Sequence, residues 1–196
     1  YLDTDRRDVT GTSDAAVPTT EGELLAERVV CWEPPVELYD QAFYGQQLGD
    51  DGAVQLSLVE AAYLAQEGLL TVDGGADAVV GRGREVEGDR FDRRLAVYAA
   101  LRASGVAPKT GFKFGADFRT YANVESAENL GHSELLVRVL PADHRFEPRD
   151  LALDVRLAHG VRKTMVFALT ADGGDGSGDS GNGNDLEWIA VERLTP

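Results

Sequence analysis

The sequence is short of cysteine, which limits both its chemistry and its surroundings. Cys31 is the only cysteine among the 196 residues, so no disulfide can form within this sequence, and the composition fits a reducing compartment. Its neighbours in RVVCWEPP indicate a small apolar strand residue rather than a reactive thiol. Long apolar runs are also missing, since none approaches the roughly 20 residues that a membrane-spanning helix needs. We therefore expect a cytoplasmic globular protein.

Lysine is also scarce, whereas acidic residues are in excess. Only three of the 19 basic residues are lysines, against 34 acidic residues and a net charge of −15. So much negative charge repels nucleic acid at low salt. It suits a cytoplasm at very high salt, where charges are screened within about 3 Å. The composition thus predicts a protein of a halophile, in which the total charge says little about binding partners.

Two short stretches depart from this acidic background. Residues 102–121 contain four basic residues and one acidic residue, and residues 155–170 contain three basic residues and no acidic one. Each stretch therefore has a local charge of +3. If the two stretches fold together, they form a patch that can hold an anion. The alternative is that each cation only extends past the end of a strand into water.

The order of segments predicts three parts. Residues 1–35 are interpreted as the closing strand pair of a preceding, truncated copy of the same fold. Their order of strand, polar loop and strand resembles that of the C-terminal segment from VFALTAD onward. Residues 36–107 predict a small N-terminal α/β subdomain, and residues 108–196 predict a second domain.

Two helices are predicted within the α/β subdomain, after short strands over residues 37–56. Ser57 and Glu60 have the spacing of a capping box, which opens the first helix. Residues 89–105 predict the second helix, because their apolar residues recur at helical spacing. These apolar residues are Phe91, Leu95, Tyr98 and Leu101.

Beyond residue 108 the pattern changes to strands around one helix. The segments TGFKFGADFRTY and SELLVRVL predict strands, and PRDLALDVRLAHG predicts a short helix. The segment RKTMVFALT predicts a strand that is apolar enough to be covered on both faces. A long loop rich in Gly and Asp and a last strand follow. This order predicts an α+β fold built around a mixed sheet.

The strand that ends at Tyr121 combines an aromatic hydroxyl with a cation. Its period of two puts Phe118 and Thr120 on one face and Asp117, Arg119 and Tyr121 on the other. A tyrosine at the end of a strand most often packs at an interface, because its ring is apolar and its hydroxyl is polar. The shared face with a cation nevertheless makes this tyrosine a candidate for chemistry.

Two further candidates follow Tyr121 in the chain. His132 precedes the next strand and has the side chain best suited to moving protons near neutral pH, although such a histidine usually bonds to a turn. Lys163 stands at the mouth of the apolar strand. The remaining histidines, His144 and His159, are interpreted as structural. Because the histidines lack ligand spacing and there is no second cysteine, we predict no metal and no cofactor.

A tyrosine, a histidine and a lysine without metal ligands suit the cleavage of a phosphodiester in RNA. The 2′-hydroxyl of RNA is an internal nucleophile, so the protein needs only a proton acceptor, a proton donor and a cation at the crowded phosphate. DNA lacks this hydroxyl and cannot react in this way.

The segments KTGFKFGADFRTY, HSELLVRVL and VRLAHGVRKTMVFAL resemble those of the archaeal tRNA-splicing endonucleases. The resemblance covers residues 38–196 and implies a catalytic domain with a restriction-endonuclease-like fold over residues 108–196. The acidic composition resembles that of haloarchaeal members, in which two copies of the subunit fold are fused and only the second is catalytic. Such a fusion would explain the first 35 residues.

The resemblance also implies a role for each candidate residue. Tyr121 matches the general base for the 2′-hydroxyl, His132 the general acid for the 5′-oxygen, and Lys163 the cation that stabilises the transition state. Arg156 and Arg193 match two arginines that bind RNA by enclosing a flipped-out base. The implied substrate is a precursor tRNA with a bulge–helix–bulge, and the implied products carry a 2′,3′-cyclic phosphate and a 5′-hydroxyl.

The resemblance finally implies that the full-length duplicated chain is a homodimer. The C-terminal strand would pair across the interface, while the acidic loop 172–185 would enter a basic groove of the facing subunit. Considered by itself, this loop is also consistent with a flexible linker, and it is only faintly similar to calcium-binding repeats.

Two other functions remain open from the sequence. A non-catalytic subunit that positions RNA is the main alternative, although the complete set of tyrosine, histidine and lysine argues against it. A metal-dependent DNA nuclease on a related sheet would need a P-D…(D/E)-x-K arrangement, and SELLVRVL lacks this spacing.

Overall fold

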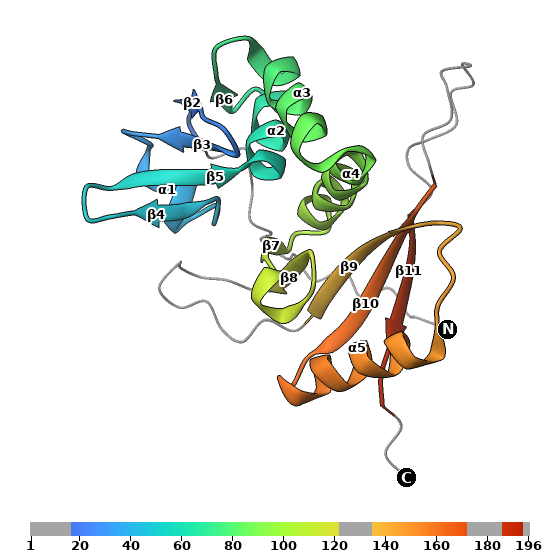
Figure 1. The fold of residues 1–196 in the computed structure, drawn as a ribbon. Coiled ribbons are helices and arrows are strands. Elements are labelled where there is room, and N and C mark those ends of the chain that lie inside the picture. The colour runs from blue at the N-terminus through green and yellow to red at the C-terminus, as the bar shows by residue number, and fades with distance from the viewer. Residues whose placement is uncertain (1–16, 122–134, 172–185, 194–196) are drawn as a thin grey trace, which may run out of the picture.

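The computed structural model describes residues 17–121, 135–171 and 186–193. Figure 1 shows two parts, a group of short strands and helices from the first half of the chain and a larger sheet with α5 from the second half. Helix α4 (Asp89–Ala103) lies between them and contacts strands of the larger sheet. The predicted α+β class is confirmed.

The N-terminal part contains two small sheets. Four strands form an antiparallel sheet in the order β2-β3-β5-β4, and two short strands, β1 and β6, pair in parallel. The strands are β1 (Thr20–Glu21), β2 (Glu23–Leu24), β3 (Arg28–Cys31), β4 (Gln46–Leu48), β5 (Ala53–Ser57) and β6 (Leu70–Thr71). A short helix that the sequence analysis did not predict, α1 (Val36–Asp40), lies between β3 and β4.

The predicted boundary at residue 35 does not separate two structural units. Strand β3 pairs with β5 from Arg28 opposite Ser57 to Cys31 opposite Val54, and β1 pairs with β6. Residues 20–31 therefore complete the sheets of the subdomain that was expected to begin at residue 36. Pairing of this kind depends on a partner more than 20 residues away, so a local pattern does not reveal it. Residues 1–16 lie outside the described part of the chain.

Two helices of this part were predicted from the sequence, and both are present. Helix α2 (Leu58–Gln66) opens with the predicted capping box, in which the Ser57 hydroxyl accepts from the Glu60 N–H and the Glu60 carboxylate accepts from the Ser57 N–H. Helix α4 confirms the predicted second helix, and all four of its predicted apolar residues are buried. Helix α3 (Gly75–Glu87) was not predicted.

The second part is a five-stranded mixed sheet in the order β11-β10-β9-β8-β7. Only β9 and β10 are parallel, whereas the other neighbours are antiparallel. The elements are β7 (Ala107–Thr110), β8 (Phe118–Tyr121), β9 (Leu135–Pro141), α5 (Pro148–Gly160), β10 (Thr164–Thr170) and β11 (Leu186–Val191). The predicted order of strands around one helix is confirmed.

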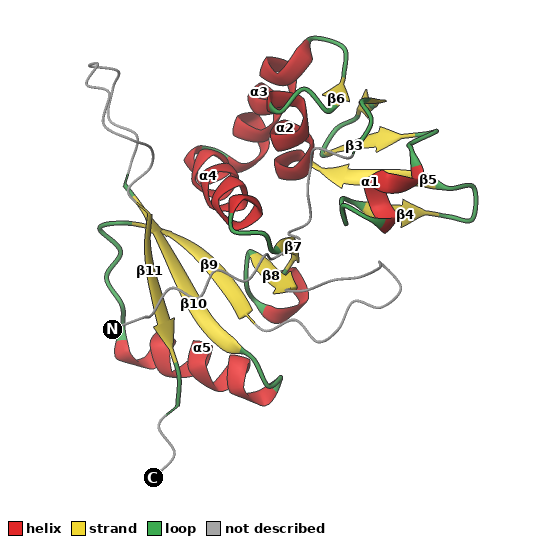
Figure 2. Cartoon of the chain, turned by 180° about the vertical axis from the view of Figure 1, so that it is seen from behind, coloured by secondary structure: helices red, strands yellow, loops and turns green. Residues whose placement is uncertain are grey.

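Helices cover both faces of this sheet, as Figure 2 shows from behind. Phe118, Val137 and Val166 belong to the main core together with residues of α4. Leu136 and Met165 belong to a second core cluster that includes Ala158 of α5. Strand β10, which lies between β11 and β9, is buried from Met165 to Thr170, which confirms that it is covered on both faces.

Strand β8 is shorter than predicted. The residues before it form a 3-10 turn, η2 (Phe112–Phe114), held between glycines. A Cβ at Gly111 would lie 2.9 Å from backbone atoms of Ala116 and Phe118, so this close approach requires glycine. The alternation is confirmed for Phe118 and Thr120, which are buried, but Asp117 precedes the strand and turns to α4 instead of sharing a face with Arg119.

Within the described ranges, we find no helix that is both long and apolar enough to cross a membrane.

Candidate active site at one edge of the sheet

The strand register brings the ends of several strands to one edge of the larger sheet. Thr120 of β8 and Thr164 of β10 both pair with Leu135, the first residue of β9. Tyr121 follows Thr120, and Lys163 precedes Thr164, so both candidates lie at this edge. They are separated by one strand, which corresponds to roughly 10 Å between the axes of β8 and β10.

Lys163 is held at this edge by the end of α5. Its backbone N–H donates to the carbonyl of Ala158 at 2.9 Å, and the preceding N–H of Arg162 donates to His159 at 3.0 Å. Arg162 has a φ of 57°, a left-handed conformation that is unfavourable for a residue with a side chain. The chain therefore turns sharply between the end of α5 and the start of β10, and Lys163 occupies the turn.

The two basic stretches meet at Lys163. The Phe114 ring lies 5.8 Å from the Lys163 ammonium and 5.8 Å from the Arg119 guanidinium, as measured from the ring centre. Desolvation and the nearby Arg119 charge together lower the pKa of Lys163. Among the described residues, the buried Nε of Arg119 has no hydrogen-bond partner. One cation from each stretch thus contributes to a local positive charge.

Tyr121 lies beside Arg119, one cation of this pair. The Arg119 guanidinium is 5.4 Å from the centre of the Tyr121 ring. The tyrosine is only 7% exposed and forms a small buried cluster with Phe43 and Ala107. Its ring is therefore tightly packed, whereas Lys163 remains partly exposed.

The remaining predicted site residues are His132, Arg156 and Arg193. His132 lies outside the described residues. Arg156 is exposed on α5, and Arg193 is exposed two residues beyond the end of β11. Met165 pairs with Val191, and continuing this antiparallel register by two residues sets Arg193 opposite Lys163.

Not all cations of the first basic stretch join the sheet edge. The Arg102 guanidinium is buried 3.7 Å from the centre of the Tyr44 ring and donates to the carbonyl of Ala42 at 2.8 Å. Lys109 donates to the carbonyl of Gly45 at 2.6 Å. These two residues connect the sheet domain and α4 to the N-terminal part.

Lys109 also lines a cavity of about 360 Å³ at the junction of the two parts. Arg28 and Arg94 line the same cavity, together with the carboxylates Glu27 and Glu60. Burial lowers the pKa of Lys109 to about 8, because the ammonium loses water that Glu60 only partly replaces. The nearby Arg102 and Arg119 charges make smaller contributions to this lowering of the pKa.

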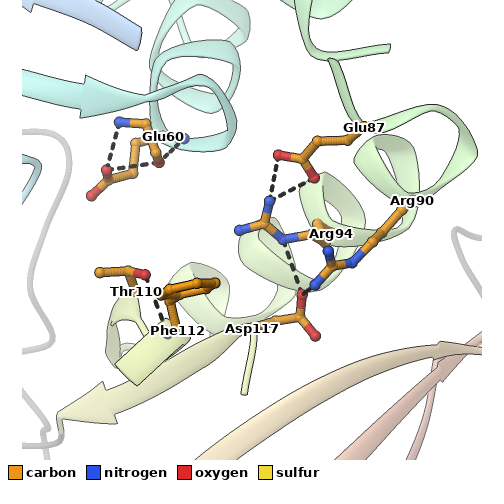
Figure 3. A network of polar contacts seen from close by, with 8 residues as sticks. Glu60, Glu87, Arg90, Arg94, Thr110, Phe112 and Asp117 are labelled. Atoms are coloured by element: carbon orange, nitrogen blue, oxygen red, sulfur yellow. Dashed lines mark hydrogen bonds and ion pairs between the residues drawn. The ribbon is translucent and has the colours of Figure 1, made fainter. Parts of the chain in front are cut away.

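A buried carboxylate fastens α4 to the sheet just before the strand that carries Tyr121. Asp117 contacts Arg90 at 2.6 Å and Arg94 at 3.2 Å, and it accepts the N–H of Val139 at 2.9 Å. Arg94 also binds Glu87 at the end of α3, and Figure 3 shows the chain of contacts from Glu87 through Arg94 to Asp117. This network holds the start of β8 in place.

Sequence reasoning missed two residues that shape this edge. Phe114 was assigned to a strand, and Phe43 was not singled out at all. The alternation of FKFGADFRTY suggested an extended segment, and only Gly111 and Gly115 in that segment gave a signal for a turn. The described residues contain no group of three or more His, Cys, Asp or Glu side chains that could bind a metal ion.

Comparisons with known proteins give one consistent result. A family described as "tRNA intron endonuclease, catalytic C-terminal domain" matches residues 91–177, and its "N-terminal domain" counterpart matches residues 20–81. The second match begins at β1, in agreement with the sheet pairing described above.

Curated relatives with the name tRNA-splicing endonuclease cover the whole chain or most of it. The Haloarcula marismortui protein is 87% identical over 196 residues, which are all of this chain and 56% of the relative. The Natronomonas pharaonis protein is 61% identical over 198 residues, with the same coverage. The Methanococcoides burtonii protein is 40% identical over 182 residues, which are 89% of this chain and 48% of the relative. The chain thus spans about half the length of these relatives.

Proposed function

This chain belongs to the tRNA intron endonuclease family, and on that premise we propose that it carries the catalytic centre of a tRNA-intron endonuclease. The observation that supports this proposal most strongly is that the strand register puts Tyr121 and Lys163 at the same edge of the sheet, one strand apart, within the part that matches the catalytic domain. The substrate would be a precursor tRNA that is cut at bulge–helix–bulge junctions between exon and intron.

The proposed reaction is a transesterification within the RNA. The 2′-hydroxyl gives its proton to the phenolate oxygen of Tyr121 and attacks the adjacent phosphorus, so that a bond from O2′ to phosphorus forms. The bond from phosphorus to O5′ breaks, and His132 supplies a proton to that oxygen. The products are a 2′,3′-cyclic phosphate and a 5′-hydroxyl, and no water or metal ion is consumed.

The role of Lys163 follows from charge. The phosphate becomes more negative as it gains a fifth oxygen neighbour, and a fixed cation lowers the barrier more than it strengthens substrate binding. Arg119 beside the same aromatic ring adds to the local positive charge. This pair of cations stands out in a chain with a net charge of −15.

The two exposed arginines would bind the bulge. Arg156 lies on α5, and Arg193 lies two residues beyond the end of β11. Both elements end near Lys163 in the chain or in the sheet register. Planar guanidinium groups stack well on an unpaired base, so the two side chains would enclose a nucleotide that is turned out of the helix.

We also propose that the full-length protein contains a second copy of the fold and is a cytoplasmic homodimer. Strand β11 is at the edge of the sheet, and Trp188 on this strand is 41% exposed, so the strand is suited to pair with a second copy. The cavity lined by Arg28, Arg94 and Lys109 is a candidate for the groove that receives the acidic loop 172–185 of the facing subunit.

The test is cleavage of a bulge–helix–bulge RNA by the full-length protein at molar salt in the presence of EDTA. We expect cleavage at both bulges, with a cyclic phosphate on one end and a hydroxyl on the other. Lys163→Ala should slow cleavage by roughly 10²–10³-fold while RNA binding changes little. Loss of activity with chelator, or ends with a 5′-phosphate, would contradict the proposal.

The test also covers the alternative of a non-catalytic subunit that positions RNA. That alternative predicts that RNA binds but that neither bulge is cut.

A further inference from the structure

Phe43 has an unusual backbone conformation. It is 1% exposed and has a φ of 60°, in the left-handed region that a bulky side chain rarely adopts. Such a conformation costs roughly 1–3 kcal/mol and persists only where the surrounding structure enforces it. Among the described residues other than glycine, only Phe43 and Arg162 have a positive φ.

Three elements enforce this conformation from both sides of Phe43. On one side, Arg102 of α4 donates to the carbonyl of Ala42 at 2.8 Å. On the other, Lys109 of β7 donates to the carbonyl of Gly45 at 2.6 Å, and the N–H of Gly45 donates to Glu60 of α2 at 3.0 Å. The short segment 42–45 is thus fixed by a helix and a strand that follow it by about 60 residues.

The side chain that this segment presents packs against the candidate active site. Phe43 forms a buried cluster with Ala107 and Tyr121, which are paired across β7 and β8. Phe43 belongs to the N-terminal part of the chain, whereas the other two belong to the sheet. The ring of Tyr121 is therefore contacted by an aromatic residue of the first part and by Arg119 of its own strand.

We propose that Phe43 is a positioning residue for catalysis, which holds the Tyr121 ring so that its hydroxyl faces the 2′-hydroxyl of the RNA. This inference rests on the proposed function, since it assigns a task to Phe43 only if Tyr121 acts on the substrate. A displacement of about 1 Å of a catalytic group reduces the rate by about 10²-fold. The N-terminal part would then contribute directly to the chemistry of the catalytic domain.

A purely structural role for Phe43 makes a different prediction. Loss of a buried ring lowers stability wherever it occurs, but only a positioning role lowers the rate of cleavage by protein that is folded and saturated with RNA. Phe91 of α4 is a matched control, because it is buried to the same degree at 0% exposure and belongs to a cluster that excludes Tyr121.

The experiment compares Phe43→Leu, Phe43→Gly and Phe91→Leu in the full-length protein. Leucine at position 43 keeps an apolar side chain and the backbone strain, whereas glycine relieves the strain and removes the ring. Single-turnover cleavage is measured at saturating RNA, and folding is checked by circular dichroism and thermal unfolding. We expect both Phe43 variants to cleave roughly 10–100-fold more slowly, with nearly unchanged RNA affinity, and Phe91→Leu to cleave at the normal rate.

A double-mutant cycle with Tyr121→Phe then separates positioning from other effects. If Phe43 acts through the Tyr121 hydroxyl, Phe43→Leu should slow the natural protein but change the residual rate of Tyr121→Phe by less than about twofold. A natural rate in both Phe43 variants, or an equal loss in both backgrounds, would overturn the positioning role while leaving the proposed function intact. A natural rate in Tyr121→Phe alone would instead overturn the role of Tyr121, and the role of Phe43 with it.

Discussion

At the scale of single residues, Lys163 is a cation whose surroundings disfavour its charge. Desolvation and then Arg119 lower its pKa from the ordinary 10.5. A lysine is charged below its pKa, so the ammonium is lost as the pH rises through a value below 10.5. If this charge stabilises the transition state, the rate of single-turnover cleavage should fall as the pH rises through the lowered pKa of Lys163.

The substitution Arg119→Gln tests this electrostatic origin. Removal of the neighbouring positive charge should raise the pKa of Lys163 and move the alkaline decline to higher pH. Arg149→Gln, which removes an exposed arginine from the start of α5, is the matched control and should leave the decline in place. An unchanged pH profile in Arg119→Gln would show that another group governs the decline. Both profiles are measured by single-turnover cleavage.

The left-handed Arg162 predicts an unusual effect of glycine. Arg162→Gly should stabilise the protein by roughly 1 kcal/mol, because glycine adopts a φ of 57° without strain. Arg156→Gly removes the same side chain six residues earlier, in the interior of α5, and should destabilise by about 1 kcal/mol. The measurement is the free energy of unfolding in denaturant. Effects of the same sign would indicate that the turn before Lys163 is not strained.

The positions of some of these residues could be predicted from the sequence, whereas others depend on contacts between segments that are far apart in the chain. The position of Lys163 just before β10 could be predicted, because a rare lysine beside an apolar run is visible in the sequence, while its catalytic role stays a prediction. Phe43 could not, because its φ and its contact with Tyr121 depend on α4 and β7, which follow much later in the chain. His132 stays a prediction, since it lies outside the described residues.

At the scale of elements, the sequence correctly predicted helices whose start or apolar face depends on residues close together in the chain. The capping box of Ser57 and Glu60 and the apolar spacing of α4 both identified helices correctly. Helix α3 was missed because it has little apolar face, with only Val79 and Gly83 buried. Gly83 is buried because the Phe91 ring packs where a side chain would be, with 2.2 Å between that ring and a Cβ at Gly83. That helix depends on a partner helix rather than on its own pattern.

The contact between α4 and the sheet depends on Asp117. Asp117→Asn should lower the free energy of unfolding by about 2–3 kcal/mol, because hydrogen bonds to a charged group are lost while Arg94 stays largely buried. Asp92→Asn is the matched control, because its ion pair with Arg84 at 2.9 Å is exposed on both sides and should contribute little to stability. Denaturant unfolding measures both. Equal losses would mean that the buried pair contributes no more than a surface pair.

At the scale of the whole molecule, several basic residues lie together although the chain as a whole is acidic. The chain has a net charge of −15, yet Arg102, Arg94 and Lys109 lie at the junction of the two parts, where Arg102 is buried. The composition could not reveal this arrangement, because it reports totals. Basic residues at the junction and an acidic loop in the same chain are complementary, which is why two copies of the chain are expected to bind each other.

The exposed edge strand gives this expectation a direct test. Trp188→Glu places a charge on β11, where the proposed pairing of two copies would bury an aromatic ring, and it should shift the full-length protein from dimer to monomer. Trp32→Glu is the matched control, since Trp32 is 57% exposed in the N-terminal part and should leave the dimer intact. Sedimentation velocity at molar salt measures the oligomeric state, because screening leaves apolar pairing as the main attraction there. If Trp188→Glu remains dimeric, another surface joins the two copies, and the acidic loop and the junction cavity become the next candidates.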